Sequence, residues 1–336
     1  MAIVSRTANL QVTRAFIASF QNQQLSLEAS REQITTGRKV NDPSDDSGRS
    51  GTIAALQETL RRLELYKDRM NIADNLLAQQ EGIMNSAEQI LVRARELATQ
   101  GANETLGVDQ RATLATEVFE LRDAFVTLAN TRLQGRYIYG GADDDDPPFD
   151  ATTYTNPADP NDPASVRYIF DNEAGTALTR SVQVNDSSAV RVTTSGDDVF
   201  TNGIIALERL GRALSGYRTT PEDLSGPPDG GGVPFVFPTE FEEQTADILE
   251  ALDLVEAARA NDLAIEKASI GSRGARIEEA RSINDTMLLN VEQSRSTYQD
   301  VDIVEAVSDF QTLQVSLEAT LATGATINRL SLLDFL

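Results

Sequence analysis

The side chains that could do chemistry in this sequence are almost all carboxylates. The chain has 336 residues, with 52 Asp plus Glu against 29 Lys plus Arg, and it has no His, no Cys and no Trp. Nucleophilic sites of the Ser-His-Asp and Cys-His kinds and zinc sites of Cys and His are therefore excluded. What remains is a carboxylate pair, Tyr, Lys, or Ca²⁺ or Mg²⁺ held by oxygen ligands.

No group of these residues has the spacing of a known site. Asp143 to Asp146 lack the spaced D-x-D-x-D-G pattern of a calcium loop, so we interpret them as a solvated acidic loop. Asp42, Asp45 and Asp46 surround Pro43 and fit turn and helix-cap chemistry. Gly230 to Gly232 are not followed by the G-K-[ST] of a phosphate loop. The sequence predicts no enzyme, no cofactor and no metal site.

Charge and hydropathy restrict the partners further. The net charge is −23 and the isoelectric point is near 4.3. A protein surface that binds phosphate groups or an anionic membrane needs clustered cations, so we expect neither nucleic acid nor membrane as a partner. The first residues, MAIVSRTANL, lack the apolar stretch of a cleaved signal peptide, and no window approaches the length of a membrane helix.

Both ends of the chain have helical periodicity. The pattern predicts helices over 12–36, 50–100 and 108–133, then again over 239–299 and 302–336. In the first segment the apolar residues form a narrow stripe with steps of three and four, as in a coiled coil. The segment Gly271 to Gly274 lies within helical pattern and is either a break or part of a continuous helix.

The middle of the chain has a different character. Residues 137–141, 167–170, 178–184 and 190–192 alternate as short strands, residues 202–216 predict one short helix, and residues 225–238 are rich in Pro and Gly. The sequence therefore predicts a mainly α fold with a β-rich insertion. A long antiparallel helical bundle would be formed from both chain ends, with an outer β domain that contains one short helix.

Two terminal motifs resemble the bacterial flagellin family. The first is QITTGRKVNDPSDD at residues 33–46, where a helix ends in a Gly-basic turn followed by an Asp pair. The second is YQDVDIVEA at 298–306, with the tail GATINRLSLLDFL at 324–336. The sequence departs from the family after the Asp pair, where SGRSG at 47–51 replaces an Ala-rich stretch. Because Gly disfavours helix by about 1 kcal/mol relative to Ala, we expect the second helix to begin later than in relatives.

Within the family two kinds of subunit resemble this chain. The segment NTRLQGRYIYGG at 130–141, followed by Pro148-Phe149, is similar to the exit strand of the junction proteins that connect hook and filament. Val184-Asn185 and residues 195–200 are also similar to the outer domain of those proteins. We favour the junction subunit, and flagellin, the filament subunit itself, is the alternative.

The resemblance implies a structural role outside the cell. It implies export without a cleaved signal through the flagellar type III apparatus, with a cytoplasmic export chaperone as partner. It then implies assembly with copies of itself at the hook–filament junction, between the first hook-associated protein and flagellin. It divides the chain into a terminal coiled-coil domain (1–42 and 300–336), a helical rod domain (43–135 and 239–299) and a β-rich outer domain (136–238).

The terminal stripes are the candidate assembly interface. Heterologous contacts between subunits generate rings or helical tubes, and a lone amphipathic helix gains from an apolar partner. Ordinary core of a monomeric bundle, or a cytosolic coiled-coil scaffold, would produce similar stripes. The candidate interface residues are Phe16, Phe20, Leu27, Ile34, Phe310, Leu313, Leu317, Leu321 and Ile327.

Overall fold

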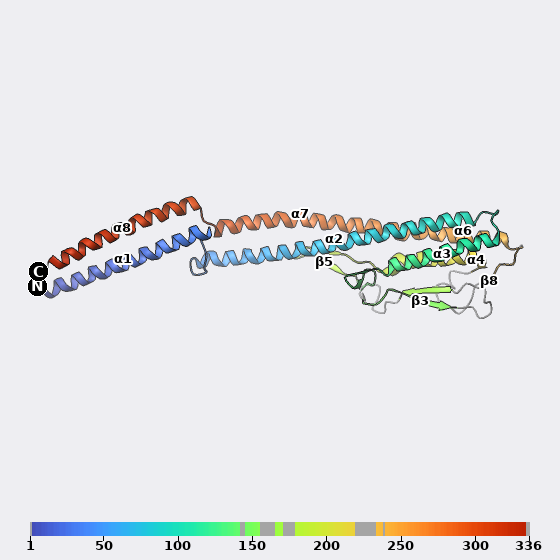
Figure 1. Cartoon of the computed structure of the whole chain (residues 1–336), viewed down its shortest axis with the longest axis horizontal. Helices are drawn as coiled ribbons and strands as arrows, with labels where there is room; N and C mark the ends of the chain where they lie inside the picture. The colour runs from blue at the N-terminus through green and yellow to red at the C-terminus, as the bar shows by residue number, and fades with distance from the viewer. Residues whose placement is uncertain are drawn as a thin grey trace. The chain divides into compact units, whose positions relative to one another are not determined.

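The computed structural model describes residues 2–141, 145–154, 165–170, 179–218, 233–237 and 239–333. The chain divides into two compact units, Met1–Glu64 with Asp285–Leu336, and Leu65–Asn284. Within each unit the described residues are mainly helical (Figure 1), which confirms the predicted fold class. The expected division into three domains remains a prediction.

The helices follow the predicted order along the chain. They are α1 (Ala2–Thr36), α2 (Ser47–Gly101), α3 (Val108–Ala129), α4 (Gly196–Ser215), α6 (Phe241–Ala257), α7 (Ala264–Gln299) and α8 (Ile303–Leu333), with a π-helical turn, η1 (Ala258–Leu263), between α6 and α7. Helix α7 runs without interruption through Gly271 and Gly274, which settles the open question about that segment.

Helix α2 begins three residues before the predicted start at residue 50. The helix begins at Ser47 because the carboxylate of Asp46 accepts hydrogen bonds from the backbone N–H groups of Gly48 (3.1 Å) and Arg49 (3.0 Å). Such an N-terminal cap contributes about 1 kcal/mol, which offsets the poor helix propensity of a glycine.

The strands form four separate antiparallel pairs in the described part of the chain. The pairs are β1 (Arg132–Leu133) with β2 (Arg136–Tyr137), β3 (Phe149–Tyr154) with β4 (Ser165–Phe170), β5 (Ser181–Gln183) with β6 (Ala189–Arg191), and β7 (Tyr217–Arg218) with β8 (Val233–Pro234). Helix α3 ends earlier than expected because Gln134 and Gly135 both have positive φ, the two-residue turn that closes the β1–β2 hairpin. The strand expected over 137–141 ends at Tyr137.

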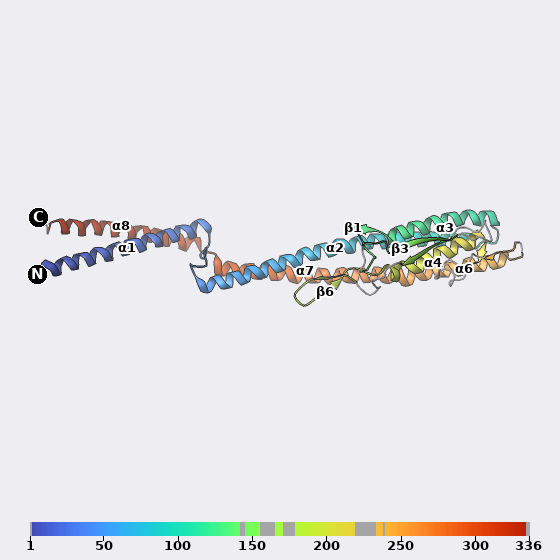
Figure 2. The same cartoon turned by 90° about the horizontal axis from the view of Figure 1, so that it is seen from below.

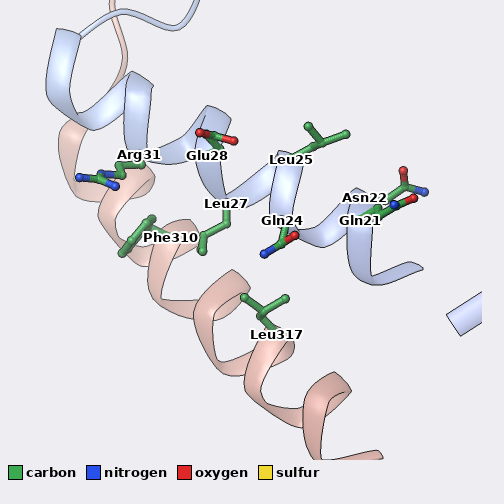
Figure 3. A pocket seen from close by; sticks show the side chains of 9 residues that line it. All are labelled: Gln21, Asn22, Gln24, Leu25, Leu27, Glu28, Arg31, Phe310 and Leu317. Atoms are coloured by element: carbon green, nitrogen blue, oxygen red, sulfur yellow. The ribbon is translucent and has the colours of Figure 1, made fainter. Parts of the chain in front are cut away.

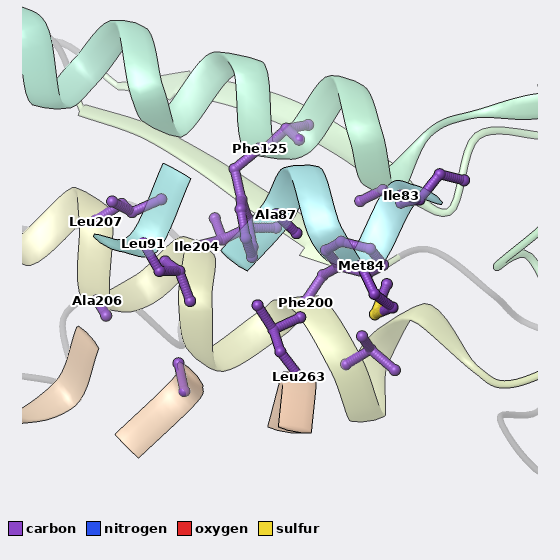
Figure 4. Packing of buried hydrophobic residues seen from close by; sticks show 14 of the residues in the cluster. Ile83, Met84, Ala87, Leu91, Phe125, Phe200, Ile204, Ala206, Leu207 and Leu263 are labelled. Atoms are coloured by element: carbon purple, nitrogen blue, oxygen red, sulfur yellow. The ribbon is translucent and has the colours of Figure 1, made fainter. Parts of the chain in front are cut away.

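Helix α4 occupies the core of the unit formed by Leu65–Asn284. It begins at Gly196, six residues before the predicted start, and it packs against α3, α6 and η1. Phe200 has edge contacts with Phe125 at 5.3 Å and with Tyr139 at 4.9 Å between ring centroids. Figure 4 shows Phe125 of α3, Phe200 and Leu207 of α4, and Met84 and Leu91 of α2 converging on this core.

Two glycines let α3 and α4 approach closely. A Cβ on Gly203 would lie 2.7 Å from the ring of Phe125, and a Cβ on Gly211 would lie 2.6 Å from the ring of Phe119. These glycines weaken the helical pattern in the sequence. Their packing role explains why α4 keeps them at its contacts with α3.

The same core contains ionised side chains. Arg122 of α3 and Glu208 of α4 form a buried ion pair, and Arg209 contacts Asp247 of α6 at 3.4 Å. Burial raises the pKa of the Glu208 carboxyl, although the nearby guanidinium of Arg122 opposes that shift. A charge removed from water is costly unless it is paired, so these pairs fix how α3, α4 and α6 can pack.

Candidate assembly surface

Helices α1 and α8 form an antiparallel hairpin within the unit Met1–Glu64 and Asp285–Leu336. Figure 2 shows the two helices side by side, with both chain ends at the same end of the hairpin. The predicted stripe on α1 faces α8. Phe16, Phe20, Leu27 and Ile34 are partly covered, and Ser30 between them is buried.

The apolar stripe predicted on α8 agrees only in part with the residues that are covered at the seam with α1. Phe310, Leu313 and Leu317 are partly covered at the seam, together with the buried Ala306. Leu321 is 50% exposed, because the steps of three and four from Leu317 lead to Thr320 and then to Gly324. Leu321 therefore lies outside the α1–α8 seam, and its place in the assembly interface remains a prediction. Ile327 lies in α8, but its side chain is outside the described residues.

One close contact and one hydrogen bond set the register of the hairpin. A Cβ on Gly324 would lie 2.2 Å from the ring of Phe16, so this ring sits directly over the glycine. Near the middle of the hairpin the amide of Gln23 donates a hydrogen bond to the hydroxyl of Ser316 at 3.3 Å. The two contacts place α1 and α8 in one antiparallel alignment.

A groove of about 730 Å³ opens along one side of this hairpin (Figure 3). Leu27, Phe310 and Leu317 form its apolar part. The polar residues along it come from α1: Gln21, Asn22, Gln24, Glu28 and Arg31. In Figure 3 Leu27 lies close to Phe310, whereas Leu25 points away from α8.

Several large apolar side chains of the hairpin are exposed. They are Ile17 and Leu25 on α1 and Ile303, Val304, Val307, Val315 and Leu321 on α8. Apart from Leu321, none of them is among the interface residues predicted from the sequence. The sequence does indicate these further apolar faces, because α8 has valines between the residues of its stripe. A helix that is apolar on more than one face is usually covered on more than one face.

The chain segments that connect α1 to α2 and α7 to α8 pair with each other. Lys39 donates its backbone N–H to the carbonyl of Gln299 at 2.6 Å, and Val301 donates to the carbonyl of Gly37 at 3.0 Å. These bonds flank an antiparallel bridge between Arg38 and Asp300. Gly37 makes the turn after α1 with a φ of 69°.

The carboxylates singled out in the sequence act as caps. Asp45 accepts hydrogen bonds from the N–H groups of Asn41 (3.0 Å) and Asp42 (2.8 Å), and Asp46 caps α2. No cluster of three or more acidic side chains suited to a metal ion is found among the described residues. Gly230 to Gly232, and Asp143 and Asp144, lie outside them. Nor does any described helix have the length and apolar character required to cross a membrane.

Comparison with known proteins places this hairpin in a family. The model for the N-terminal helical region of bacterial flagellin matches residues 8–143, and the model for the C-terminal helical region matches residues 252–336. The chain belongs to the bacterial flagellin family. Both terminal helices, the paired connections and α2 therefore lie in regions that the family shares.

Some members of the flagellin family match nearly the whole chain. The flagellar hook-associated protein 3 of Escherichia coli K12 is 24% identical over 319 residues, which cover 90% of both chains. A solved structure of flagellar hook-associated protein 3 from Legionella pneumophila has a TM-score of 0.58 and 15% identity, and covers 73% of this chain and 98% of that one. That structure supports the fold.

Flagellins match a smaller part. Flagellin A of Vibrio anguillarum is 31% identical over 117 residues, which are 34% of this chain and 31% of that protein. The hook-associated protein therefore aligns through the middle of the chain, whereas the flagellin alignment covers one third of it.

Proposed function

We propose that this chain is the junction subunit that connects the hook of the bacterial flagellum to its filament. The observation that carries this proposal is the extent of the match to hook-associated protein 3, which spans 90% of both chains. The terminal regions are common to the whole family, so they do not discriminate between its members. The middle of the chain does, and it aligns with the hook-associated protein.

The role we propose is structural. The carboxylates at the turn after α1 accept hydrogen bonds from backbone N–H groups. Other carboxylates form the buried ion pairs described above. Its partners would be copies of itself, the first hook-associated protein on one side and flagellin on the other. Before export, a cytoplasmic chaperone would bind it, and the flagellar type III apparatus would secrete it without a cleaved signal.

The α1–α8 hairpin is the part of the chain that we assign to assembly. The seam residues, Phe20 and Leu317 among them, hold α1 against α8, and Ile327 would extend the contact toward the chain end. Phe20→Asp and Leu317→Asp should leave the chain soluble, because the core of the unit Leu65–Asn284 is untouched. Both variants should fail to enter flagella, and normal incorporation in a count of labelled particles would contradict the assignment.

Immunogold microscopy of purified flagella tests the function directly. The antibody is raised against residues 141–238, and a strain that lacks the chain serves as the control. Gold confined to a short collar between hook and filament is the expected result. Gold along the whole filament would instead identify flagellin, and absence of gold from flagella of an expressing strain would refute both.

Flagellin deserves its own test because it shares the terminal regions. A filament subunit should polymerise into long filaments when purified and salted out with ammonium sulfate. We expect the purified chain to form no such filaments under conditions in which a flagellin control does. Long filaments would overturn the junction proposal.

A further inference from the structure

The two sides of the α1–α8 hairpin differ in chemistry. Residues of a helix advance by about 100° each, so their spacing assigns them to a side. On the groove side, α8 carries the exposed Val307 and Leu321, and α1 carries the exposed Ile17. On the opposite side of α8 the exposed residues are Ser308, Asp309, Thr312, Ser316 and Thr323. The groove side of the hairpin therefore combines exposed apolar residues with the polar residues of α1, whereas these exposed residues on the opposite side of α8 are all polar.

A third face of α8 points away from the seam and is also apolar. Val304 is 80% exposed and Val315 is 66% exposed. They are eleven residues apart, which is close to three turns, so they point in the same direction about 16 Å apart. We refer to Val304 and Val315 as the valine ridge. The seam residue Leu313 is two positions from Val315 and faces nearly the opposite way.

We propose that the valine ridge of a second copy docks into the groove of this hairpin. This inference rests on the proposed function and adds the two surfaces through which copies meet. The groove residues of α1 run from Gln21 to Arg31, about 15 Å along the helix, which matches the length of the ridge. An apolar helix face that docks against the apolar part of a groove is a common mode of helix recognition, and Leu27, Phe310 and Leu317 supply that part here.

Charge favours this pairing over contact between two ridges. Helix α8 contains three acidic residues and one arginine, whereas α1 contains three arginines and two glutamates. Glu318 lies one turn after Val315 on the ridge side. The groove contains one acidic residue, Glu28, and Arg31 lies at its end, one turn beyond Glu28. Two ridges in contact would bring like charges together, while a ridge in the groove would bring Glu318 toward the more basic helix.

The consequence is a heterologous interface. The ridge and the groove are different surfaces of one hairpin, so each copy offers a groove while its ridge is bound elsewhere. Contacts of this kind propagate from copy to copy and generate a ring or a helical array. The seam residues would then maintain the shape of each copy, and the exposed apolar residues would join the copies.

Engineered cysteines test this arrangement, because the chain has none of its own. The full-length variants Gln24→Cys, at the groove, and Val315→Cys, on the ridge, are coexpressed in a strain that lacks the chain. Mild oxidation of the purified flagella should give a disulfide between position 24 of one copy and position 315 of another. Thr312→Cys, on the polar side of α8, should give none with position 24.

A charge substitution supplies a second measurement. Val315→Glu should reduce incorporation into flagella at least tenfold, whereas Thr312→Glu, with the same charge on the same helix, should not. Both should keep the helix content of the wild-type chain by circular dichroism. Dimers formed by Val315→Cys alone, or equal incorporation of the two Glu variants, would overturn the inference. If the wild-type chain is found at the junction but the variants give either of these contrary results, only the assignment of the ridge and groove is refuted. If the wild-type chain is absent from flagella, the proposed function is refuted as well.

Discussion

The buried pair Arg122–Glu208 shows how single residues fix the packing of two helices. The side chains are 6% and 3% exposed, so each charge is compensated mainly within the protein, and Arg122 also pairs with Asp123 at 2.8 Å. The Glu208 carboxyl has a raised pKa because burial disfavours its charge. Removing Arg122 takes the nearest guanidinium from the buried Glu208 carboxyl, and breaking a buried pair in this way typically costs about 3–5 kcal/mol.

We therefore expect Arg122→Met to destabilise the chain by about 3–5 kcal/mol and the double variant Arg122→Met/Glu208→Leu to recover most of that loss. The apolar pair would fill a similar volume without a charge to solvate. Urea unfolding of the single and double variants measures the difference. Strictly additive losses would show that the two side chains do not compensate each other.

Two glycines should respond in opposite directions to the same substitution. Gly203→Ala places a Cβ 2.7 Å from the ring of Phe125, and that ring is fully buried against Phe200. We expect a loss of about 1–3 kcal/mol, typical of overpacking. Gly271→Ala meets no atom within 4 Å and lies inside α7, so it should stabilise the chain by up to about 1 kcal/mol. Thermal melts of both variants give the two signs, and stabilisation by Gly203→Ala would contradict this packing.

At the scale of elements, α2 and α7 are joined by an ion pair whose contribution to stability depends on pH. Lys267 of α7 donates to the carboxylate of Glu88 of α2 at 2.6 Å, and this hydrogen bond lowers the pKa of Glu88 from 4.5. Because the pKa of Glu88 is lower in the folded chain than in the unfolded chain, the ion pair stabilises the folded state at pH values above the unfolded-state pKa. This stabilisation is lost as the pH falls through the folded-state pKa. Glu88→Gln should lower the melting temperature at pH 7 and have no effect near pH 2. An equal effect at both values would exclude the ion pair as the cause.

The elements that could be predicted are those whose signal is periodic and local. The long helices follow from their apolar spacing, and residues 33–46 identify the turn after α1. Helix α4 was predicted to begin six residues late because Gly196, Asp197 and Asp198 at its start are typical of a turn. The ion pairs of Glu208 and Arg209 were not predicted, because the sequence alone does not identify their partners. The pairing of those charges is a long-range property. The contact of Gly324 with Phe16 was not predicted for a related reason, since a glycine contributes no apolar side chain to a periodic pattern.

At the scale of the whole molecule, apolar burial is uneven. The large hydrophobic cluster lies entirely within Leu65–Asn284, from Met70 to Ile277. In the other unit the α1–α8 seam is narrow, and several of its neighbours are exposed. Local opening needs less free energy where fewer apolar contacts are lost. The hairpin should therefore open far more often than the core helices in the free chain.

Hydrogen exchange followed by mass spectrometry measures this difference. In the free chain, backbone amides of α1 and α8 should exchange at least a hundredfold faster than those of α4, which is buried on most sides. In assembled flagella the amides of α1 and α8 should become protected, because neighbouring copies cover the valine ridge and the groove. Protection of the hairpin equal to that of α4 in the free chain would mean that α1 and α8 are already held without neighbours. Assembly would then have to proceed by docking of hairpins that are already formed, and not by α1 and α8 becoming ordered when a chain joins its neighbours.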